Sequence, residues 1–238
     1  MTTECYFTAA PMAGHKLGPV SGNPIGNLRV ASWNLLRRIG AGAEHVARLI
    51  HVVRPDLLLL QEVTEEIGAL PSLVGGHFFR LPMQKRIYGL AAWSPQPFPP
   101  PSILRLPVSA LPGRVPLRVV QIVKFRGISF ANVHLSHGQF LNRFQLHHIA
   151  YALEGPAVII GDFNAVGPSV VPEFHDVGPR QHTHRASNII SLRLDRCMTR
   201  DVHCLSAEVL DKGPSDHHPI VLDLAEVDAI RGSTVVAR

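Results

Sequence analysis

Ala157-Val-Ile-Ile-Gly-Asp-Phe-Asn164 is the stretch that is most informative about the fold. Its first four residues are small or β-branched and apolar, and a short apolar run that ends at glycine is typical of a strand covered on both faces. We expect Gly161 to allow a tight turn before Asp162 and Asn164. In extended backbone a spacing of two places both polar side chains on one face, so a carboxylate and an amide point in one direction. The structural alternative is an Asx-turn at the strand end.

The composition indicates one globular domain. A chain of 238 residues with 46% hydrophobic and 17% charged residues is long enough for one sizeable core, and this composition excludes intrinsic disorder. The net charge of +5 favours a polyanionic partner or an anionic surface. Cys5, Cys197 and Cys204 are odd in number and widely spaced, so we expect neither a disulfide framework nor a cysteine zinc site.

No segment of the sequence predicts secretion or membrane insertion. The N-terminus lacks a basic stretch followed by an apolar core, as a signal peptide would have. No apolar run approaches the ~20 residues that span a bilayer. Together with the cysteine pattern, this predicts a cytoplasmic protein, which we expect to be a monomer.

Apolar strands and a few helices alternate along the chain. Residues 1–27 read as an irregular lead-in, 28–224 as the catalytic domain and 225–238 as a tail. The order of elements predicts a mixed α/β core of two sheets with helices outside. We expect helices at 42–53, 65–73 and 139–153, the last with Phe140, Leu141, Phe144, Ile149 and Leu153 at helical spacing, and strands at 28–34, 56–62, 77–81, 88–93, near 103, 117–125, 128–135, 157–162, 191–198, 207–210 and 219–224.

Polar side chains recur where the apolar strands end. If those strand ends converge, they form one pocket that holds carboxylates, amides and imidazoles. Carboxylate and amide oxygens without thiolates are the ligands of a hard cation such as Mg²⁺ or Mn²⁺. Histidine beside aspartate supplies an oriented base or a cationic donor, and the whole set suits hydrolysis at phosphorus. The residues concerned are Asn34, Glu62, His134, Asp162, Asn164, Asp195, Asp216 and His217.

Six short motifs in this order resemble the endonuclease/exonuclease/phosphatase superfamily. The resemblance covers residues 28–224 and implies a four-layer α/β sandwich, two packed mixed sheets flanked by helices, that hydrolyses phosphate esters with Mg²⁺ or Mn²⁺. The histidine in the third motif resembles the deoxyribonuclease-like and sphingomyelinase-like branches. The motifs are Ser32-Trp-Asn34, Gln61-Glu62, Asn132-Val-His-Leu135, Gly161-Asp-Phe-Asn164, Leu194-Asp195 and Ser215-Asp-His217.

The resemblance also implies a role for each motif residue. Glu62 is expected to be the principal metal ligand, with Asn34 beside it and Asp216 as a second carboxylate on the metal side. Leu36 stands where some abasic-site endonucleases carry Asp. This difference argues against a second metal ion and against assignment to the abasic-site branch. The expected catalytic residues are His134 for the leaving group or phosphorane, Asp162 and Asn164 for the water, and His217 held by Asp195 for the phosphate, with Asp162 and His217 both open as the base.

Several other residues are weaker candidates. Arg143 and His184 are possible substrate contacts, and Lys85 and Arg86 possible phosphate contacts; surface or solvated positions are the alternative for all four. Adjacent His217 and His218 cannot both face a pocket in extended backbone, and we take His217 as the functional one. An ion pair with Arg193 or Arg196 is the structural alternative for Asp195.

Three functions remain open at this point. The first is a metal-dependent phosphodiesterase acting on nucleic acid, which the basic charge favours, although no run of interleaved aromatic and basic residues predicts a stacking groove. The second is hydrolysis of a small or lipid-linked phosphate ester. The third is a non-catalytic binding module, which the complete motif set disfavours.

Overall fold

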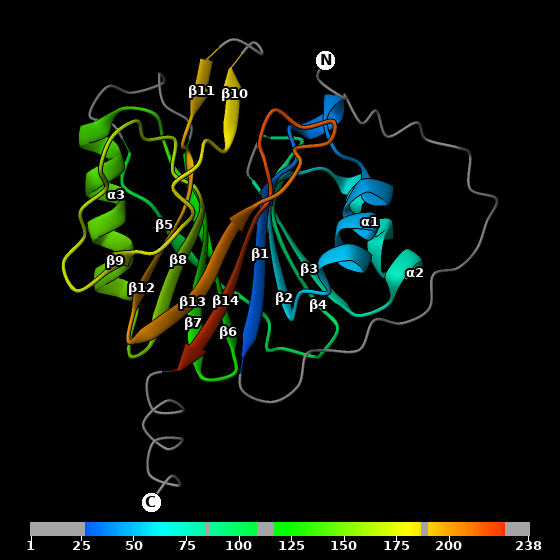
Figure 1. Cartoon of the computed structure of the whole chain (residues 1–238), viewed down its shortest axis with the longest axis horizontal. Helices are drawn as coiled ribbons and strands as arrows, with labels where there is room; N and C mark the ends of the chain where they lie inside the picture. The colour runs from blue at the N-terminus through cyan, green and yellow to red at the C-terminus, as the bar shows by residue number, and fades with distance from the viewer. Residues whose placement is uncertain (1–26, 84–85, 109–116, 187–189, 227–238) are drawn as a thin grey trace, which may run out of the picture.

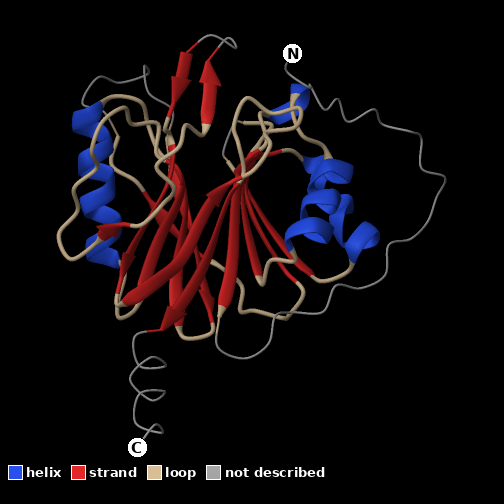
Figure 2. Cartoon of the chain, viewed as in Figure 1, coloured by secondary structure: helices blue, strands red, loops and turns tan. Residues whose placement is uncertain are grey.

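A computed structural model of the protein describes residues 27–83, 86–108, 117–186 and 190–226. Two six-stranded sheets pack face to face, and helices cover their outer faces (Figure 1). Helices α1 (Ala43–Val53) and α2 (Leu70–Val74) cover one sheet, and α3 (Gln139–Ala152) covers the other (Figure 2). The predicted four-layer α/β sandwich is therefore confirmed.

Both sheets are mixed, because β1 pairs in parallel with β2 and β7 with β8, whereas the other pairs are antiparallel. Short 3₁₀ turns lie at Arg37–Ile39 and Glu65–Ala69, and a separate hairpin joins β10 (His184–Ala186) to β11 (Ile190–Leu192). The first sheet has the order β13 (Val202–Val209), β14 (Ile220–Glu226), β1 (Leu28–Asn34), β2 (Leu57–Val63), β4 (Gly89–Ser94), β3 (His77–Pro82), and the second β5 (Ser102–Arg105), β6 (Val119–Phe125), β7 (Ile128–His134), β8 (Ala157–Asp162), β12 (Asp195–Arg200), β9 (His175–Asp176).

The continuous apolar run of β2 is divided between two cores. Leu57 and Leu59 pack between the sheets, whereas Leu58 and Leu60 pack with the residues of α1 and α2. This division follows from the period of two in a strand, since successive side chains point to opposite faces. A strand buried on both faces needs apolar residues at every position, and this is why these strands read as unbroken apolar runs.

The strand predicted at 191–198 is wrong, because the chain forms two strands there. β11 ends at Leu192 and β12 begins at Asp195. The hydroxyl oxygen of Thr183 accepts the backbone N–H groups of Leu194, at 3.0 Å, and of Asp195, at 2.8 Å. Asp195 therefore starts a strand and does not end one; it still reaches the same edge of the sheet, because β12 is antiparallel to β8 and Asp195 lies opposite Asp162.

Helix α3 exists as predicted, and Ile149 and Leu153 are buried, but Phe140 and Phe144 of the same apolar spacing face solvent. Phe140 is 94% exposed and Phe144 70%, whereas Asn142 and Gln145 are buried. The two amides turn inward because the backbone beneath them needs partners: Asn142 Nδ2 donates to Phe163 O, and Gln145 Oε1 accepts the N–H of Ser136 at 3.0 Å. Leu146 and Ile149 complete the buried face.

Gly161 does not form the expected turn. It lies inside β8 with φ +136°, a conformation that favours glycine. A Cβ atom there would collide with the carbonyl oxygen of Val133 and would lie 3.1 Å from Gln61 Nε2. Glycine is needed here because a neighbouring strand and a side chain of the opposite sheet approach the backbone closely.

The predicted lead-in and tail fall outside the described residues at 1–26 and 227–238, and β14 continues to Glu226, two residues beyond the predicted end of the domain. The proposed boundaries stay a prediction. In the described part of the chain, no helix has the length and apolarity to cross a membrane.

A buried amide joins the two sheets near the edge where the motifs lie. Asn132 on β7 donates across the seam to the backbone oxygens of Leu60 and Ala91, each at 3.1 Å. Its Oδ1 accepts from Gln61 Nε2 at 2.8 Å. Buried polar groups are costly unless they are paired, so this side chain fixes how the sheets are aligned.

We predict that Asn132→Ala lowers the free energy of unfolding by about 3 kcal/mol, because the truncation leaves several buried polar groups without partners. Urea unfolding followed by circular dichroism measures this change. Lys124→Ala, an exposed change on the neighbouring strand, should alter stability by less than about 0.5 kcal/mol. Equal stabilities of the two variants would contradict a structural role for the amide.

Candidate active site

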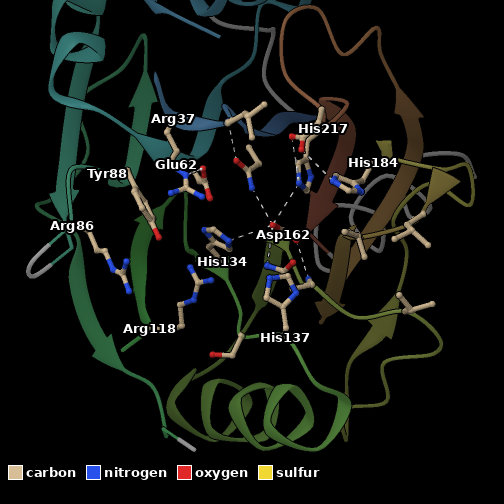
Figure 3. Close-up of a pocket in the computed structure, with 18 residues that line it drawn as sticks. Arg37, Glu62, Arg86, Tyr88, Arg118, His134, His137, Asp162, His184 and His217 are labelled. Atoms are coloured by element: carbon tan, nitrogen blue, oxygen red, sulfur yellow. Dashed lines mark hydrogen bonds and ion pairs between the residues drawn. The ribbon is translucent and has the colours of Figure 1, made fainter. Parts of the chain in front are cut away.

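A cavity of about 600 Å³ opens where the carboxyl ends of β1, β2, β7 and β8 meet. Three carboxylates line it, those of Glu62, Asp162 and Asp216. The structure thus brings together the residues singled out from separate sequence motifs, and Figure 3 shows Asp162 between His134 on one side and His217 on the other. Further predicted residues in the lining are Asn34, Asn164 and His184.

Asp162 is the buried centre of the site. Its Oδ2 accepts hydrogen bonds from Asn34 Nδ2 at 3.0 Å and Asn164 Nδ2 at 3.1 Å, and its Oδ1 accepts the backbone N–H of Asn164 at 2.9 Å. Burial raises the pKa of this carboxyl, although His217 and the hydrogen bonds oppose the increase. The Asx-turn is therefore present, and the same carboxylate also faces the cavity.

His217 is held by a second carboxylate. Its Nδ1 lies 2.8 Å from Asp195 Oδ2, and its Nε2 lies 3.8 Å from Asp162 Oδ2. Burial of the imidazole lowers its pKa, but the charges of Asp195, Asp162 and Asp216 outweigh burial and raise the pKa to about 10. His217 is therefore an imidazolium at neutral pH. The Asp195 carboxylate pairs with this histidine, and Arg193 pairs instead with Asp176 at 2.6 Å.

The β10–β11 hairpin holds the His217 segment in place. His218 N–H donates to Thr183 O at 2.7 Å, and Arg185 N–H donates to Asp216 O at 2.9 Å. His184 lies over His217, with ring centroids 4.4 Å apart, and its Nε2 lies 3.4 Å from Asp216 Oδ2. The weakly supported candidate His184 is thus part of the cavity wall.

His134 differs from His217 in charge. Burial, with the nearby Arg118 guanidinium as the next cause, holds the pKa of His134 well below its usual range. Its Nε2 lies 3.5 Å from Asp162 Oδ2, but the ring is uncharged at neutral pH and the contact is not an ion pair. The site therefore places one neutral and one cationic imidazole on the same carboxylate.

Glu62 enters the cavity from a β-bulge. The register between β2 and β4 shifts between Gln61 and Val63, and Glu62 has φ +55°. Bulges re-aim a side chain next to functional sites, and a positive φ at a non-glycine residue is a strained conformation. Burial raises the pKa of the Glu62 carboxyl, while Arg37, whose Nε lies 2.9 Å from Oε2, lowers it.

The oxygen donors of the cavity fit a divalent cation. Glu62, Asn34 and Asp216 line one space, and Asp216 Oδ1 has no hydrogen-bond partner among the described residues. Two groups have donor atoms within 4.8 Å of one another: Asp162 with Asp195 and His217, and His184 with Asp216 and His217. Neither group contains Glu62, the predicted principal ligand. Carboxylate and amide oxygens are the preferred ligands of Mg²⁺.

Cationic side chains line the wall opposite His184, and most of them were not predicted (Figure 3). Arg118 is 5% exposed, and its Nε and Nη1 have no partner among the described residues; burial lowers its pKa. The predicted hairpin 117–135 could have identified Arg118 as a residue near the cavity. Gln121 pairs with Asn132, and continuing this pairing places Arg118 opposite Leu135, the last residue of the motif that contains His134. The other unpredicted polar lining residues are Arg37, Tyr88, Ser136 and His137.

Some of the other candidate residues line the cavity, and others lie outside it. Arg86 lines the cavity, whereas Lys85 falls outside the described residues. Arg143 is exposed on α3 and lines a separate hollow beside Val170. His218 points away from the cavity, and its Nδ1 lies 2.7 Å from Leu210 O, in agreement with its predicted structural position.

Comparisons with known proteins agree with this geometry. The sequence profile described as "Endonuclease/Exonuclease/phosphatase family" matches residues 31–217. No curated protein sequence matches the chain.

Solved structures of similar fold come from several organisms. An endonuclease/exonuclease/phosphatase from Bacteroides vulgatus is 18% identical, with a TM-score of 0.68 over 84% of this chain and 99% of that one. A mannosyl-6-phosphatase from Bacteroides thetaiotaomicron is 17% identical, with a TM-score of 0.66 over 83% and 99%. D. rerio TDP2 complexed with single strand DNA product is 16% identical, with a TM-score of 0.62 over 83% and 98%. At these identities the similarity extends to the fold alone.

The His217–Asp195 pair predicts a pH dependence of stability. The pKa of His217 is higher in the folded protein, about 10, than the ~6.5 of an unfolded chain. The pair therefore stabilises the fold fully below pH 6.5 and loses this contribution as the pH rises toward 10, at up to about 1.4 kcal/mol per pH unit. Asp195→Asn should flatten this slope, as measured by urea unfolding at several pH values between 6.5 and 9.

An exposed histidine on β13 provides the control, because His203→Gln should leave the slope as it is in the wild type. If Asp195→Asn and the wild type lose stability equally with pH, the imidazolium is not held by Asp195.

Proposed function

The chain belongs to the Endonuclease/Exonuclease/phosphatase family, and from this premise we propose that it is a Mg²⁺-dependent hydrolase of phosphodiesters, with nucleic acid as the substrate class. The observation that carries the proposal is the buried Asp162 carboxylate, which lies between an imidazolium, a neutral imidazole and two amides. Such a set can both receive a proton from water and stabilise a phosphate whose charge is increasing.

Asp162 is the base in this proposal. A base must be unprotonated at working pH, and a histidine with a pKa of about 10 holds its proton there. Asp162 accepts the proton of the attacking water, which Asn164 helps to orient. The water oxygen bonds to phosphorus, the bond from phosphorus to the leaving oxygen breaks, and that oxygen takes a proton from solvent. Its raised pKa makes the carboxylate more basic than an exposed aspartate.

His217 donates a charge-assisted hydrogen bond to a non-bridging phosphate oxygen, and Asp195 keeps its ring oriented through Nδ1. His134 is neutral, so hydrogen bonding to the phosphorane suits it better than giving up a proton. His134 and His217 thus contact different oxygens of the substrate, and only His217 is charged.

Glu62, Asn34 and Asp216 would hold the divalent ion. The ion would neutralise phosphate charge and lower the pKa of bound water. Burial of Glu62, which is 8% exposed, supports this assignment, since a buried carboxylate is costly without a cation. Asp216 is only partly buried. Mg²⁺ is proposed because the donors are oxygens, and Mn²⁺ has similar preferences.

Nucleic acid is favoured by the charge of the cavity wall. Arg37, Arg86 and Arg118 face the space beside the carboxylates, and the whole chain carries a net charge of +5. A polyanion has phosphates on both sides of the scissile one, which the arginines could contact. In addition, the similar TDP2 structure was solved with a single strand DNA product.

A phosphate monoester or other small phosphate ester is the second candidate substrate. A cavity of about 600 Å³ is within the range of small-molecule sites, and one protein of similar fold is a mannosyl-6-phosphatase. A non-catalytic binding module is disfavoured, because each catalytic residue expected from the motifs is present in the sequence.

A substrate panel with Mg²⁺ or Mn²⁺ tests the function directly. The panel contains single- and double-stranded DNA, RNA, nucleotides, phosphomonoesters and phospholipids. We expect cleavage of polynucleotides that stops on chelation and falls by roughly a thousandfold or more in Asp162→Ala and Glu62→Ala. Activity on a small ester alone would shift the conclusion to the second candidate. Inactivity on every substrate would contradict the hydrolase proposal.

Replacing Arg118 should affect substrate binding and protein stability in different ways. The Nε and Nη1 atoms of its buried guanidinium have no hydrogen-bond partner among the described residues, so Arg118→Met should be at least as stable as the wild type. Loss of its charge-assisted hydrogen bonds to phosphate should nevertheless lower kcat/KM by roughly ten- to a hundredfold. The exposed Arg105→Met is the matched control. A variant that loses stability and keeps its kcat/KM would show that Arg118 is structural.

A further inference from the structure

Helix α3 presents a row of ring side chains to solvent. Phe140, Phe144, His147 and Tyr151 follow one another at spacings of three and four on α3, and His137 lies just before the helix. All five are exposed, and here they are called the ring stripe. Phe140 is 94% exposed, Phe144 70% and Tyr151 93%. Residues three and four apart lie on one face of a helix, so the stripe is continuous along α3.

Among the described residues, exposed aromatic side chains are concentrated on α3. No phenylalanine, tyrosine or tryptophan outside α3 is exposed there, and the other large exposed hydrophobic residues are aliphatic and dispersed over other elements. An exposed apolar patch on a monomer marks an interaction site more often than single exposed side chains do. These rings are not part of the core, because the buried face of α3 consists of Asn142, Gln145, Leu146 and Ile149.

The ring stripe begins at the catalytic cavity. His137 lines the cavity and precedes α3, and Phe140 is the second residue of the helix. Gln139 Nε2 donates to Val166 O at 2.7 Å, and Val166 also lines the cavity. From Phe140 to Tyr151 the helix rises about 16 Å, so the stripe extends well beyond the space where a phosphate would react. Figure 3 shows α3 below the cavity, beyond His137.

The charge around the ring stripe suits an anion. Helix α3 contains no Asp or Glu, and Arg143 is exposed between Phe140 and Phe144. His147 and His148 are exposed on the same helix. A partner with anionic groups and flat apolar groups would be complementary to both properties.

The chemistry of the exposed side chains distinguishes between partners. Leu146 and Ile149 are buried and Leu141 is half-buried, so α3 exposes rings but no large aliphatic side chain. Coiled-coil seams are built from aliphatic residues at their core positions, which α3 does not expose. Nucleobases stack on aromatic rings whatever their sequence, while basic side chains contact the backbone phosphates.

We propose that the ring stripe is a binding track for single-stranded polynucleotide that extends from the catalytic cavity. Bases stack on Phe140 and Phe144, and Arg143 contacts the phosphates between them. The sequence alone predicted no stacking groove, because it does not show that these rings face solvent. This inference rests on the proposed nuclease function and specifies its substrate: a single strand long enough to reach from the cavity along α3.

The test measures binding without catalysis. A labelled single-stranded 20-mer and a trinucleotide are titrated with the full chain in chelator, and fluorescence anisotropy gives the affinity. Phe140→Ala/Phe144→Ala should weaken 20-mer binding by roughly tenfold or more, since stacking on each ring contributes substantially. The trinucleotide should be bound equally by both proteins. Val52→Ala, at a 75% exposed position on α1, should leave both affinities unchanged.

Parallel measurements distinguish the alternatives. Equal 20-mer affinity for the double variant and the wild type would overturn the track, and so would Phe140-dependent binding to phosphatidylserine vesicles without oligonucleotide binding. A wild-type dimer that the double variant converts to a monomer, seen by light scattering, would also overturn it in favour of a second copy. Cleavage of the trinucleotide with Mg²⁺ tests the hydrolase separately, so the track can fail while the proposed function stands.

Discussion

The hydrogen bond from Asn34 to Asp162 is the contact on which the site depends. Asn34 ends β1 in one sheet and Asp162 ends β8 in the other, and the amide lies 3.0 Å from the carboxylate. A buried carboxylate is tolerated only when hydrogen bonds and cations surround it. Both sheets must therefore bring their strand ends to one point, and this requirement creates the cavity.

The same requirement explains the polar residues behind the cavity. Asn132 links the sheets at their seam, and Trp33 Nε1 donates to His217 O at 3.0 Å. Asn142 and Gln145 on α3 satisfy the backbone of the loops after β7 and β8. These side chains do not face the substrate, but they hold the loops that do, which is why α3 directs its amides inward and can leave its rings free.

The sequence predicted the layers and the meeting of several motif residues at one cavity, because strand ends and motifs are local signals. Asn34, Glu62, His134 and Asp162 each follow an apolar run, and parallel neighbours bring such ends together. The features that the sequence did not predict depended on strand direction and on which side chains are buried. Asp195 reaches the site from the start of an antiparallel strand. The outward direction of Phe140 could not be predicted, because hydrophobic periodicity alone does not reveal which loops need buried amides.

The central claim is that segments distant in the sequence surround one divalent ion beside Asp162. Anomalous diffraction from crystals soaked in Mn²⁺ locates such an ion directly. The account predicts an anomalous peak in the cavity within bonding distance of the Glu62 carboxylate, with Asn34 or Asp216 as a further ligand. Mn²⁺ bound only elsewhere on the protein, with Glu62 still paired to Arg37, would contradict it.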